Sequence, residues 1–298
     1  MTAARAPRRR IDGVLLLDKP AGLSSNAALQ RAKRLYAAEK AGHTGTLDPL
    51  ASGLLPICFG EATKFAQSML DARKAYVATV RFGAATTTGD AEGDVIATGA
   101  VAFGCSDIEA ALARFVGTIA QVPPRHAALK YRGRAYYDYA RAGVEIPRTA
   151  REVEIVALEL VGWSPPDAIV RVACGKGMYV RVLAEDVAAA LGTYAHLAAL
   201  RRTAVGPFGI ERSHALAELE AMDIAARDAC LLAADAPLAD LPRLDVDADV
   251  ARALRQGRTP RSTRAAGRFR AYSAGGFVGV VESDAQTLRA VRLARTDE

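Results

Sequence analysis

The sequence predicts an α+β protein in which helices flank a mixed, largely antiparallel sheet, followed by a small β-rich module at the C-terminus. Three stretches alternate apolar and polar residues with the period of a strand, namely 75–82, 152–161 and 168–174. These strands follow one another without regular βαβ alternation, which favours antiparallel pairing over a Rossmann-type sheet. A change of composition near residue 235 marks the second module.

Three other stretches have the apolar period of a helix. They span 24–36, 107–116 and about 179–191. In the second helix, we expect Asp107 to be the N-cap and Gly117 to end the helix. In the third, Leu183, Val187 and Leu191 recur at four-residue spacing and should face the sheet.

The chain has 298 residues, which is more than one typical domain. We expect a basic N-terminal arm over residues 1–10, a main body over 11–234 and a C-terminal module over 235–298. The segment 235–244 carries two prolines and is typical of a linker or domain entry.

Positive charge is concentrated in the C-terminal module. The net charge of the chain is +6, and residues 250–281 contain seven arginines but no Asp or Glu. A run of arginines is most often a solvated face, but the absence of acids favours phosphate groups of a nucleic acid as its partner. We therefore expect the module to bind RNA.

Composition argues against several classes of protein. The four cysteines contain no Cys-x-x-Cys pair and the four histidines have no ligand spacing, so we expect neither a disulfide nor a metal. The pair Gly175-Lys176 lacks the following Ser or Thr of a P-loop. The apolar run 14–17 is too short for a signal peptide or a membrane span, so we expect a cytoplasmic protein without a membrane partner.

One loop, residues 42–53, surrounds a single acid with small and turn-forming residues. The acid is Asp48, and Pro49 fixes the backbone directly after it and biases Asp48 away from a helical conformation. The glycines on either side permit a close approach between backbone and ligand. Taken alone, such a loop is more often a surface turn than a catalytic site.

Several further segments share this character and together give the sequence a specific resemblance. They are GVLLLDKPAGLSS (13–25), AGHTGTLDPLASGLLPI (41–57), GEATKF (60–65), KAY (74–76), ALKYRGRAYYDYARAG (128–143), GKGMYVR (175–181) and HLAALRRTAVGPF (196–208). In this order they resemble the TruB family of bacterial tRNA pseudouridine-55 synthases, from about residue 11 to residue 209. Beyond residue 210 the match weakens, and the C-terminal part looks like the small β-barrel, PUA-type RNA-binding module often found there in this family.

The resemblance implies the pseudouridine synthase fold and an isomerase that changes one uridine of the tRNA T-arm loop from an N1–C1′ to a C5–C1′ link. No cofactor or metal is implied. The catalytic aspartate of the family falls on Asp48, which would act as an ionised carboxylate. Whether it attacks the uracil ring or acts at the sugar stays open.

Two more residues are catalytic by the same resemblance. Arg181, the arginine of GKGMYVR, is expected within about 4 to 6 Å of Asp48, where it would favour the charged carboxylate. Without the resemblance, Arg181 would more often be a surface residue paired with Glu185. Tyr76 would stack on the target base and is a candidate for moving the C5 proton, although the identity of the proton acceptor stays open.

The remaining site residues are implied to bind substrate. His43 would support the RNA loop after the target base flips out of its stack. Lys19 and Lys130 would lie near phosphate or pocket carboxylates, and Tyr179 and Leu200 would wall the pocket.

The sequence departs from the family pattern in two places. Residues 125–127 are Arg-His-Ala where the family commonly has Met-Tyr-Ser, and the Arg and His could contact RNA. Gly175, Met178 and Val180 stand in the later motif where Ser, Thr and Ile are common, which removes any hydrogen bond from those hydroxyls.

The expected partner is the T-arm stem-loop of tRNA, bound by a monomer. Two alternatives stay open from the residues alone. The chain could be a tRNA-binding folding helper that acts without chemistry, or a synthase with a different target nucleotide.

Overall fold

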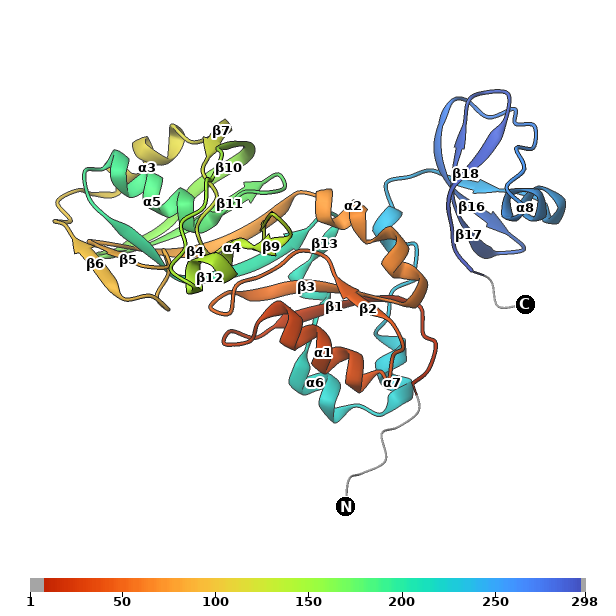
Figure 1. The fold of residues 1–298 in the computed structure, drawn as a ribbon, viewed down its shortest axis with the longest axis horizontal. Coiled ribbons are helices and arrows are strands. Elements are labelled where there is room, and N and C mark those ends of the chain that lie inside the picture. The colour runs from red at the N-terminus through yellow and green to blue at the C-terminus, as the bar shows by residue number, and fades with distance from the viewer. Residues whose placement is uncertain (1–7, 296–298) are drawn as a thin grey trace, which may run out of the picture.

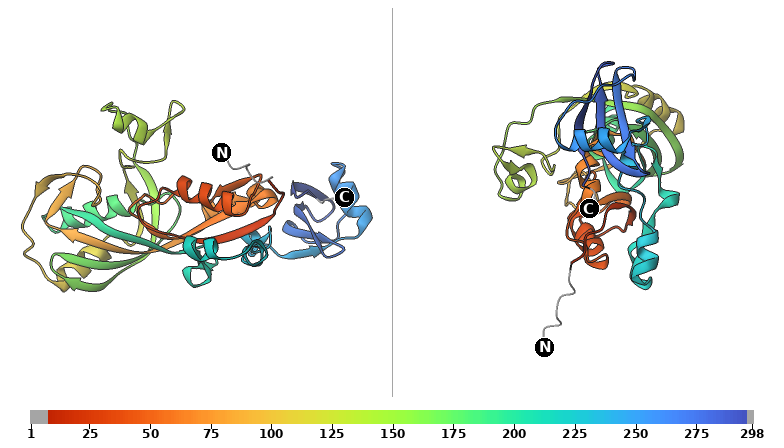
Figure 2. Two further views of the ribbon diagram at one scale, coloured as in Figure 1. Left: turned by 90° about the horizontal axis from the view of Figure 1, so that it is seen from below. Right: turned by 90° about the vertical axis from the view of Figure 1, so that its right-hand side faces the viewer.

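The computed structural model describes residues 8–295, so most of the predicted basic arm over residues 1–10 lies outside the described part. The molecule is elongated, and one long sheet runs through its body (Figure 1). The C-terminal module, drawn in blue, lies at one end of this body (Figures 1 and 2).

The main sheet has ten strands. In spatial order, eight of them are β14 (His214–Ala215), β1 (Gly13–Lys19), β3 (Ser52–Phe59), β12 (Ala195–Val205), β4 (Lys74–Phe82), β11 (Asp167–Cys174), β10 (Arg151–Ser164) and β7 (Gly117–Gln121). The other two, β2 (Ala41–His43) and β13 (Phe208–Gly209), pair with β3 and β12. Most pairs are antiparallel, as the sequence predicts, and all three predicted strands are present as β4, β10 and β11.

The sheet consists of two halves joined by a narrow seam, at which β12 pairs in parallel with β3. Only two residue pairs form this junction, Arg201 with Ser52 and Arg202 with Gly53. On its other side β12 pairs with β4 over most of its length. A Cβ at Gly53 would clash with the backbone of Arg202, so close pairing at the seam requires glycine.

Each half of the sheet has its own helices and its own core. Against the β1–β3 half pack α1 (Ser25–Leu35), α6 (Leu216–Ala221) and α7 (Ile224–Ala229), and against the β4–β11 half pack α3 (Cys105–Ala113) and α5 (Val180–Ala190). Tyr76 and Leu200 contact both cores, since they lie beside the seam.

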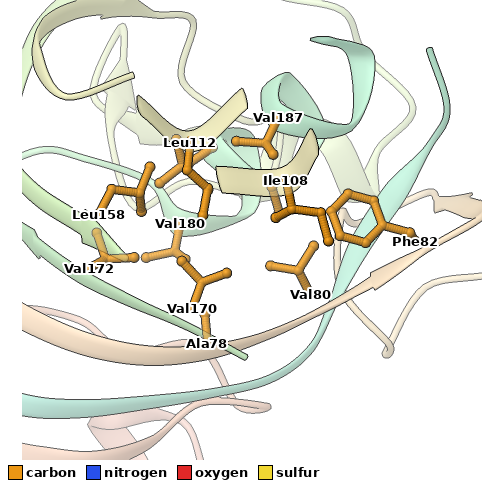
Figure 3. A pocket seen from close by; sticks show the side chains of 12 residues that line it. Ala78, Val80, Phe82, Ile108, Leu112, Leu158, Val170, Val172, Val180 and Val187 are labelled. Atoms are coloured by element: carbon orange, nitrogen blue, oxygen red, sulfur yellow. The ribbon is translucent and has the colours of Figure 1, made fainter. Parts of the chain in front are cut away.

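Figure 3 shows the core that fixes α5 against the sheet. Its side chains come from α3, α5, β4, β10 and β11, and all are apolar: Ala78, Val80, Phe82, Ile108, Leu112, Leu158, Val170, Val172, Val180, Leu183, Ala184 and Val187. The residual space among them is about 10 Å³, no more than one water would need, so this is packed core and not a ligand site. The core holds the first turn of α5 in a fixed place.

Two of the predicted helices have the expected limits, and one does not. Helix α1 begins after Ser24, whose side chain accepts a hydrogen bond from the backbone N–H of Ala27. The prediction that Asp107 caps the helix over 107–116 is wrong, because α3 begins at Cys105 after Gly104. Asp107 instead accepts a hydrogen bond from the Gly104 N–H from within the first turn.

A short arm projects from the body between β7 and β10. It contains β8 (Lys130–Tyr131), β9 (Arg134–Ala135) and α4 (Tyr136–Arg141), and it is drawn in yellow-green at the top of the left view in Figure 2. Another small hairpin, formed by β5 (Ala84–Thr86) and β6 (Val95–Thr98), follows β4.

The C-terminal module is a four-stranded sheet beside α8 (Ala248–Arg255). Its strands, in order, are β15 (Arg243–Asp245), β16 (Gly267–Ser273), β17 (Gly276–Ser283) and β18 (Leu288–Leu293). The strand order is open rather than a closed barrel in the described residues.

The module packs on the body through a small apolar cluster and several polar contacts. Phe65 lies in the 3-10 helix η1 (Gly60–Phe65), just before α2 (Ala66–Asp71). The centroid of its ring lies 5.3 Å from the ring centroid of Phe277. Lys64 donates to the carbonyl of Leu293 at 3.1 Å. Two further 3-10 helices are η2 (Ile210–Arg212), between β13 and β14 of the body, and η3 (Ala236–Leu238), at the start of the C-terminal segment.

Candidate active site

The loop before β3 is fixed by the first residue of α1. The Ser25 hydroxyl donates to the carbonyl of Leu47 at 2.9 Å and accepts from its N–H at 2.7 Å. Gly45 and Gly53 have φ of +105° and +103°, a region that favours glycine. This fixed loop presents Asp48 towards the first turn of α5.

Arg181 forms the ion pair with Asp48 that the sequence predicts. Its Nη2 lies 2.9 Å from Asp48 Oδ2, and the arginine side chain is only 6% exposed, against 37% for Asp48. The carbonyls of Thr88 and His126 accept from its other N–H groups at 2.9 and 3.0 Å. The alternative pairing with Glu185 is not what the structure shows, since α5 turns Arg181 inwards.

A second carboxylate, Asp90, lies behind this pair. Its Oδ2 is 3.8 Å from Arg181 Nε, and it accepts hydrogen bonds from the Thr88 hydroxyl and the Glu92 N–H. Burial raises the pKa of Asp48, and Arg181 opposes that rise, while Asp90 adds to it. The sum of these effects leaves the pKa of Asp48 above the ordinary range.

Asp48 and Arg181 lie on the wall of a cavity of about 300 Å³. Tyr76, Tyr179 and Leu200 line it too, as the sequence predicts. The cavity size is at the lower end of the range for small-ligand sites. The structure therefore brings together, from both halves of the sheet, an acid, its cation and an aromatic wall.

Neither of the two predicted lysines lines the cavity. Lys19 is fully buried and donates to the carbonyls of Pro20 and Leu23, so it is not accessible to a phosphate. Burial lowers the pKa of Lys19 to about 8, while the charge of Asp48 opposes this shift. The sequence predicts Lys130 near phosphate or pocket carboxylates. Lys130 is exposed on the projecting arm and does not line the cavity, so contact with phosphate stays a prediction.

His43 lies on β2, outside the cavity lining. Its Nδ1 is buried without a hydrogen-bond partner among the described residues. Burial, and then the charge of Arg202, lower the pKa of His43, so its imidazole is neutral at pH 7.

Two buried residues of the site were missed by the sequence reasoning. Asp90 lies in a Thr- and Gly-rich stretch whose composition indicates only a loop. Arg202 also lines the cavity, although it is only 1% exposed. Its position two residues after Leu200 in an alternating strand, where Arg201 takes the opposite face, was the available signal.

The projecting arm is basic and aromatic. Each of three arginines lies over a tyrosine ring: Arg132 over Tyr131, Arg134 over Tyr139 and Arg141 over Tyr137, at 5.3, 4.9 and 5.5 Å. Residues 126–129 at the base of this arm line the cavity. Such a surface suits unpaired bases and their phosphates.

The arginines of the C-terminal module fall into two groups. Three have carboxylate partners from outside the acid-free stretch: Arg252 with Asp249, Arg268 with Glu282 and Arg270 with Asp235. The other four are exposed and form no ion pair within residues 8–295; they are Arg255, Arg258, Arg261 and Arg264. We call these four the free arginine set.

Two general features of the described residues bear on function. No helix among them is long and apolar enough to cross a membrane. No group of three or more His, Cys, Asp or Glu side chains within residues 8–295 is placed to hold a metal ion.

Comparison with known proteins gives consistent matches along the chain. Residues 33–180 match the model of the TruB family pseudouridylate synthase N-terminal domain, and residues 181–239 match the tRNA pseudouridylate synthase B C-terminal domain. The chain is 55% identical to tRNA pseudouridine synthase B of Thiobacillus denitrificans, over 97% of this chain and 98% of that protein. The corresponding protein of Chromobacterium violaceum is 52% identical, over 95% and 94%.

Solved structures share the fold. A chain in the crystal structure of a Cbf5-Nop10-Gar1 complex matches with a TM-score of 0.71 and 24% identity, over 95% of this chain and 84% of that one. A chain in the structure of an H/ACA RNP bound to a substrate RNA matches with a TM-score of 0.66, over 91% and 78%.

Proposed function

Because the chain belongs to the TruB family of pseudouridylate synthases, we propose that it isomerises one uridine in the T-arm loop of tRNA, at position 55, to pseudouridine. The pairing of Asp48 with Arg181 on the wall of the 300 Å³ cavity carries this proposal. The relatives named above supply the RNA class, because each is called a tRNA pseudouridine synthase.

In this reaction the N1–C1′ bond breaks, a C5–C1′ bond forms, C5 loses its proton and N1 gains one. No atom is added or removed, so side chains alone can supply the chemistry. The target base must first leave its stack to reach a cavity inside the protein. Tyr76 and Leu200 would then hold the base between them, with Asp48 beside the sugar.

Asp48 must be ionised to act as a nucleophile or as an electrostatic partner. Its partly buried position favours the neutral acid, and the ion pair with Arg181 favours the carboxylate. Arg181 is held by two backbone carbonyls in addition to Asp48, so its guanidinium is fixed before substrate arrives. Tyr76 is the side chain best placed to move the C5 proton, since it faces the base.

RNA outside the cavity would contact the projecting arm and the C-terminal module. Lys130 and the three Arg–Tyr pairs would bind the loop nucleotides, and His43 would support the loop from β2. The free arginine set would bind phosphates of the stem. We also propose that the C-terminal module begins near residue 235, where the composition changes and after which the separate four-stranded sheet follows.

The test is Asp48→Asn with an unmodified T-arm stem-loop transcript as substrate. We expect pseudouridine formation to disappear while RNA affinity stays within about threefold. The matched control is Asp167→Asn, which removes a carboxylate that also pairs with an arginine, Arg81, but lies outside the cavity lining, and it should leave the rate unchanged.

Persistent activity in Asp48→Asn would show that the catalytic assignment is wrong. If the wild-type protein modifies total tRNA only at other nucleotides, the target assignment is wrong although the reaction class holds. If the protein is a folding helper without chemistry, the wild-type protein and the Asp48→Asn variant should improve tRNA folding equally well. Neither would then form pseudouridine.

A further inference from the structure

Arg202 is the largest fully buried side chain of the described residues, and it lies at the seam of the sheet. It is 1% exposed and forms no ion pair with a carboxylate within residues 8–295. A guanidinium keeps its charge under all ordinary conditions, and a buried charge without a counter-ion is costly. Such a residue needs an explanation beyond packing.

The contacts of Arg202 reach both halves of the sheet. Its Nε donates to the carbonyl of Leu54 on β3 at 2.7 Å, and its Nη2 donates to the carbonyl of Gly45 at 3.1 Å. Gly45 lies three residues before Asp48 in the same fixed loop. Arg202 itself belongs to β12, so one side chain ties the Asp48 loop to the other half of the molecule.

The second catalytic candidate, Tyr76, lies on β4, the strand that flanks β12 on the side opposite β3. Arg202 is the direct partner of Tyr76 in the antiparallel ladder between β12 and β4. Side chains of directly paired residues lie on the same face of a sheet. Both side chains line the cavity. Burial raises the pKa of Tyr76, and the charge of Arg202 opposes that rise.

The charge of Arg202 also acts on its cationic neighbours. Burial is the largest cause that lowers the pKa of Lys74, and the charge of Arg202 is the second largest. The charge of Arg202 also lowers the pKa of Lys19. Lys74 lines the cavity and is held by the carbonyls of Leu70 and Ala72. Arg202 and Lys74 therefore bring positive charge to the lining of the cavity that Asp48 also lines.

We propose that Arg202 is a positioning residue of the isomerisation: it fixes the Asp48 loop relative to Tyr76 across the seam and orients the Tyr76 hydroxyl. This inference rests on the proposed function, because the proposed function assigns Asp48 and Tyr76 their roles. Arg202 lines the cavity that would hold the base, where negative charge develops when the N1–C1′ bond breaks and the electron pair stays with uracil.

The experiment compares Arg202→Met and Arg202→Lys with the control Arg201→Met. Arg201 is the adjacent arginine on the same strand, but it is exposed and pairs with Asp18. Single-turnover rates and dissociation constants are measured on the T-arm stem-loop, at temperatures well below the melting temperature of each variant. Conversion by the wild-type protein tests the proposed function, and the ratio of variant to wild type tests Arg202.

We expect Arg202→Met to lower the single-turnover rate by about 10²- to 10³-fold while RNA affinity stays within about threefold, because misplacing reacting groups by about 1 Å has effects of this size. Arg202→Lys should restore part of the rate, since it keeps the charge but not the fixed fork of donors. Arg201→Met should match wild type. A rate within about threefold of wild type in Arg202→Met, or an equal loss of rate and affinity, would overturn the proposal.

A second readout does not depend on turnover or on a stable Met variant. Protein labelled with 3-fluorotyrosine gives one ¹⁹F signal per tyrosine, and Tyr76→Phe identifies the signal of residue 76. We expect this signal to move in Arg202→Lys and to stay unchanged in Arg201→Met. An unmoved signal in Arg202→Lys would show that Arg202 does not act on Tyr76.

Discussion

Arg181 and Arg202 lie inside the body with at most 5% of their surface exposed, whereas the free arginine set lies on the surface of the C-terminal module. Both groups carry the same charge. The two buried arginines donate hydrogen bonds to backbone carbonyls, and Arg181 also pairs with Asp48. The free arginine set has no carboxylate partner among the described residues.

This difference in burial separates two functions of one residue type. A buried guanidinium acts at full strength on its neighbours and fixes their geometry, so its loss should slow chemistry. An exposed guanidinium is screened by water and salt, so its loss should weaken binding in proportion to the phosphates that it contacts. The following experiments test whether rate and affinity separate in this way.

The largest expected effect is on rate, in Arg181→Met. We expect the single-turnover rate to fall by about 10³-fold, because removing Arg181 leaves the partly buried carboxylate of Asp48 without its cation and raises the pKa of Asp48 further. RNA affinity should change by no more than about threefold. Arg81→Met is the matched control, since Arg81 also pairs with an aspartate but is exposed. A fall in affinity as large as the fall in rate would break the separation.

The second effect is on affinity, when all four residues of the free arginine set are replaced by Gln. We expect RNA binding to weaken by about 10- to 100-fold near 0.15 M salt, and the plot of log K against log salt to lose about one unit of slope per lost phosphate contact. The single-turnover rate at saturating RNA should not change. Filter binding across a salt series measures both quantities.

The control for this prediction is the double variant Arg252→Gln/Arg268→Gln. Both arginines belong to the same module but already pair with carboxylates. They should contribute less to the salt dependence than any two of the free arginines. If the slope falls equally in both variants, the distinction between paired and free arginines has no functional meaning.

Patterns within one segment allowed much of this molecule to be predicted. Period-two alternation was enough for β4, β10 and β11, and an apolar stripe with a Ser cap was enough for α1. The pairing of Asp48 with Arg181 was predicted from the resemblance of the two motifs to the family, since local pattern alone favoured Glu185 as the partner of Arg181.

Features that depend on how distant segments meet could not be predicted. The role of Arg202 follows from the register of β12 against β3 and β4, which no local pattern encodes. Lys130 shares a motif with pocket residues, yet the chain turns outwards into the arm directly after Leu129. The acid-free composition of residues 250–281 suggests that all its arginines are unpaired, although acids from flanking segments reach three of them.

The pH dependence of the rate tests the buried side of the comparison more finely. The pKa of Asp48 is raised above its ordinary value of 3.8, so its carboxylate takes up a proton at a higher pH than an exposed Asp. The single-turnover rate should therefore fall as pH is lowered, with its half-maximum above about pH 4. Circular dichroism and RNA binding at each pH show whether the protein is folded and saturated. A rate that stays constant down to about pH 4.5 would mean that Arg181 outweighs burial at Asp48.

The smallest effects separate two arginines within the C-terminal module, Arg268 and Arg270. Arg268 is 58% exposed and pairs with Glu282, so Arg268→Gln should change the free energy of unfolding by less than about 0.5 kcal/mol. Arg270 is 21% exposed and pairs with Asp235, which also accepts from the Tyr272 hydroxyl. Its replacement by Gln leaves a partly buried carboxylate short of a partner, so we expect a loss of about 1 kcal/mol. Urea unfolding of the two variants measures the difference, and equal losses would show that burial does not decide the strength of arginine contacts in this module.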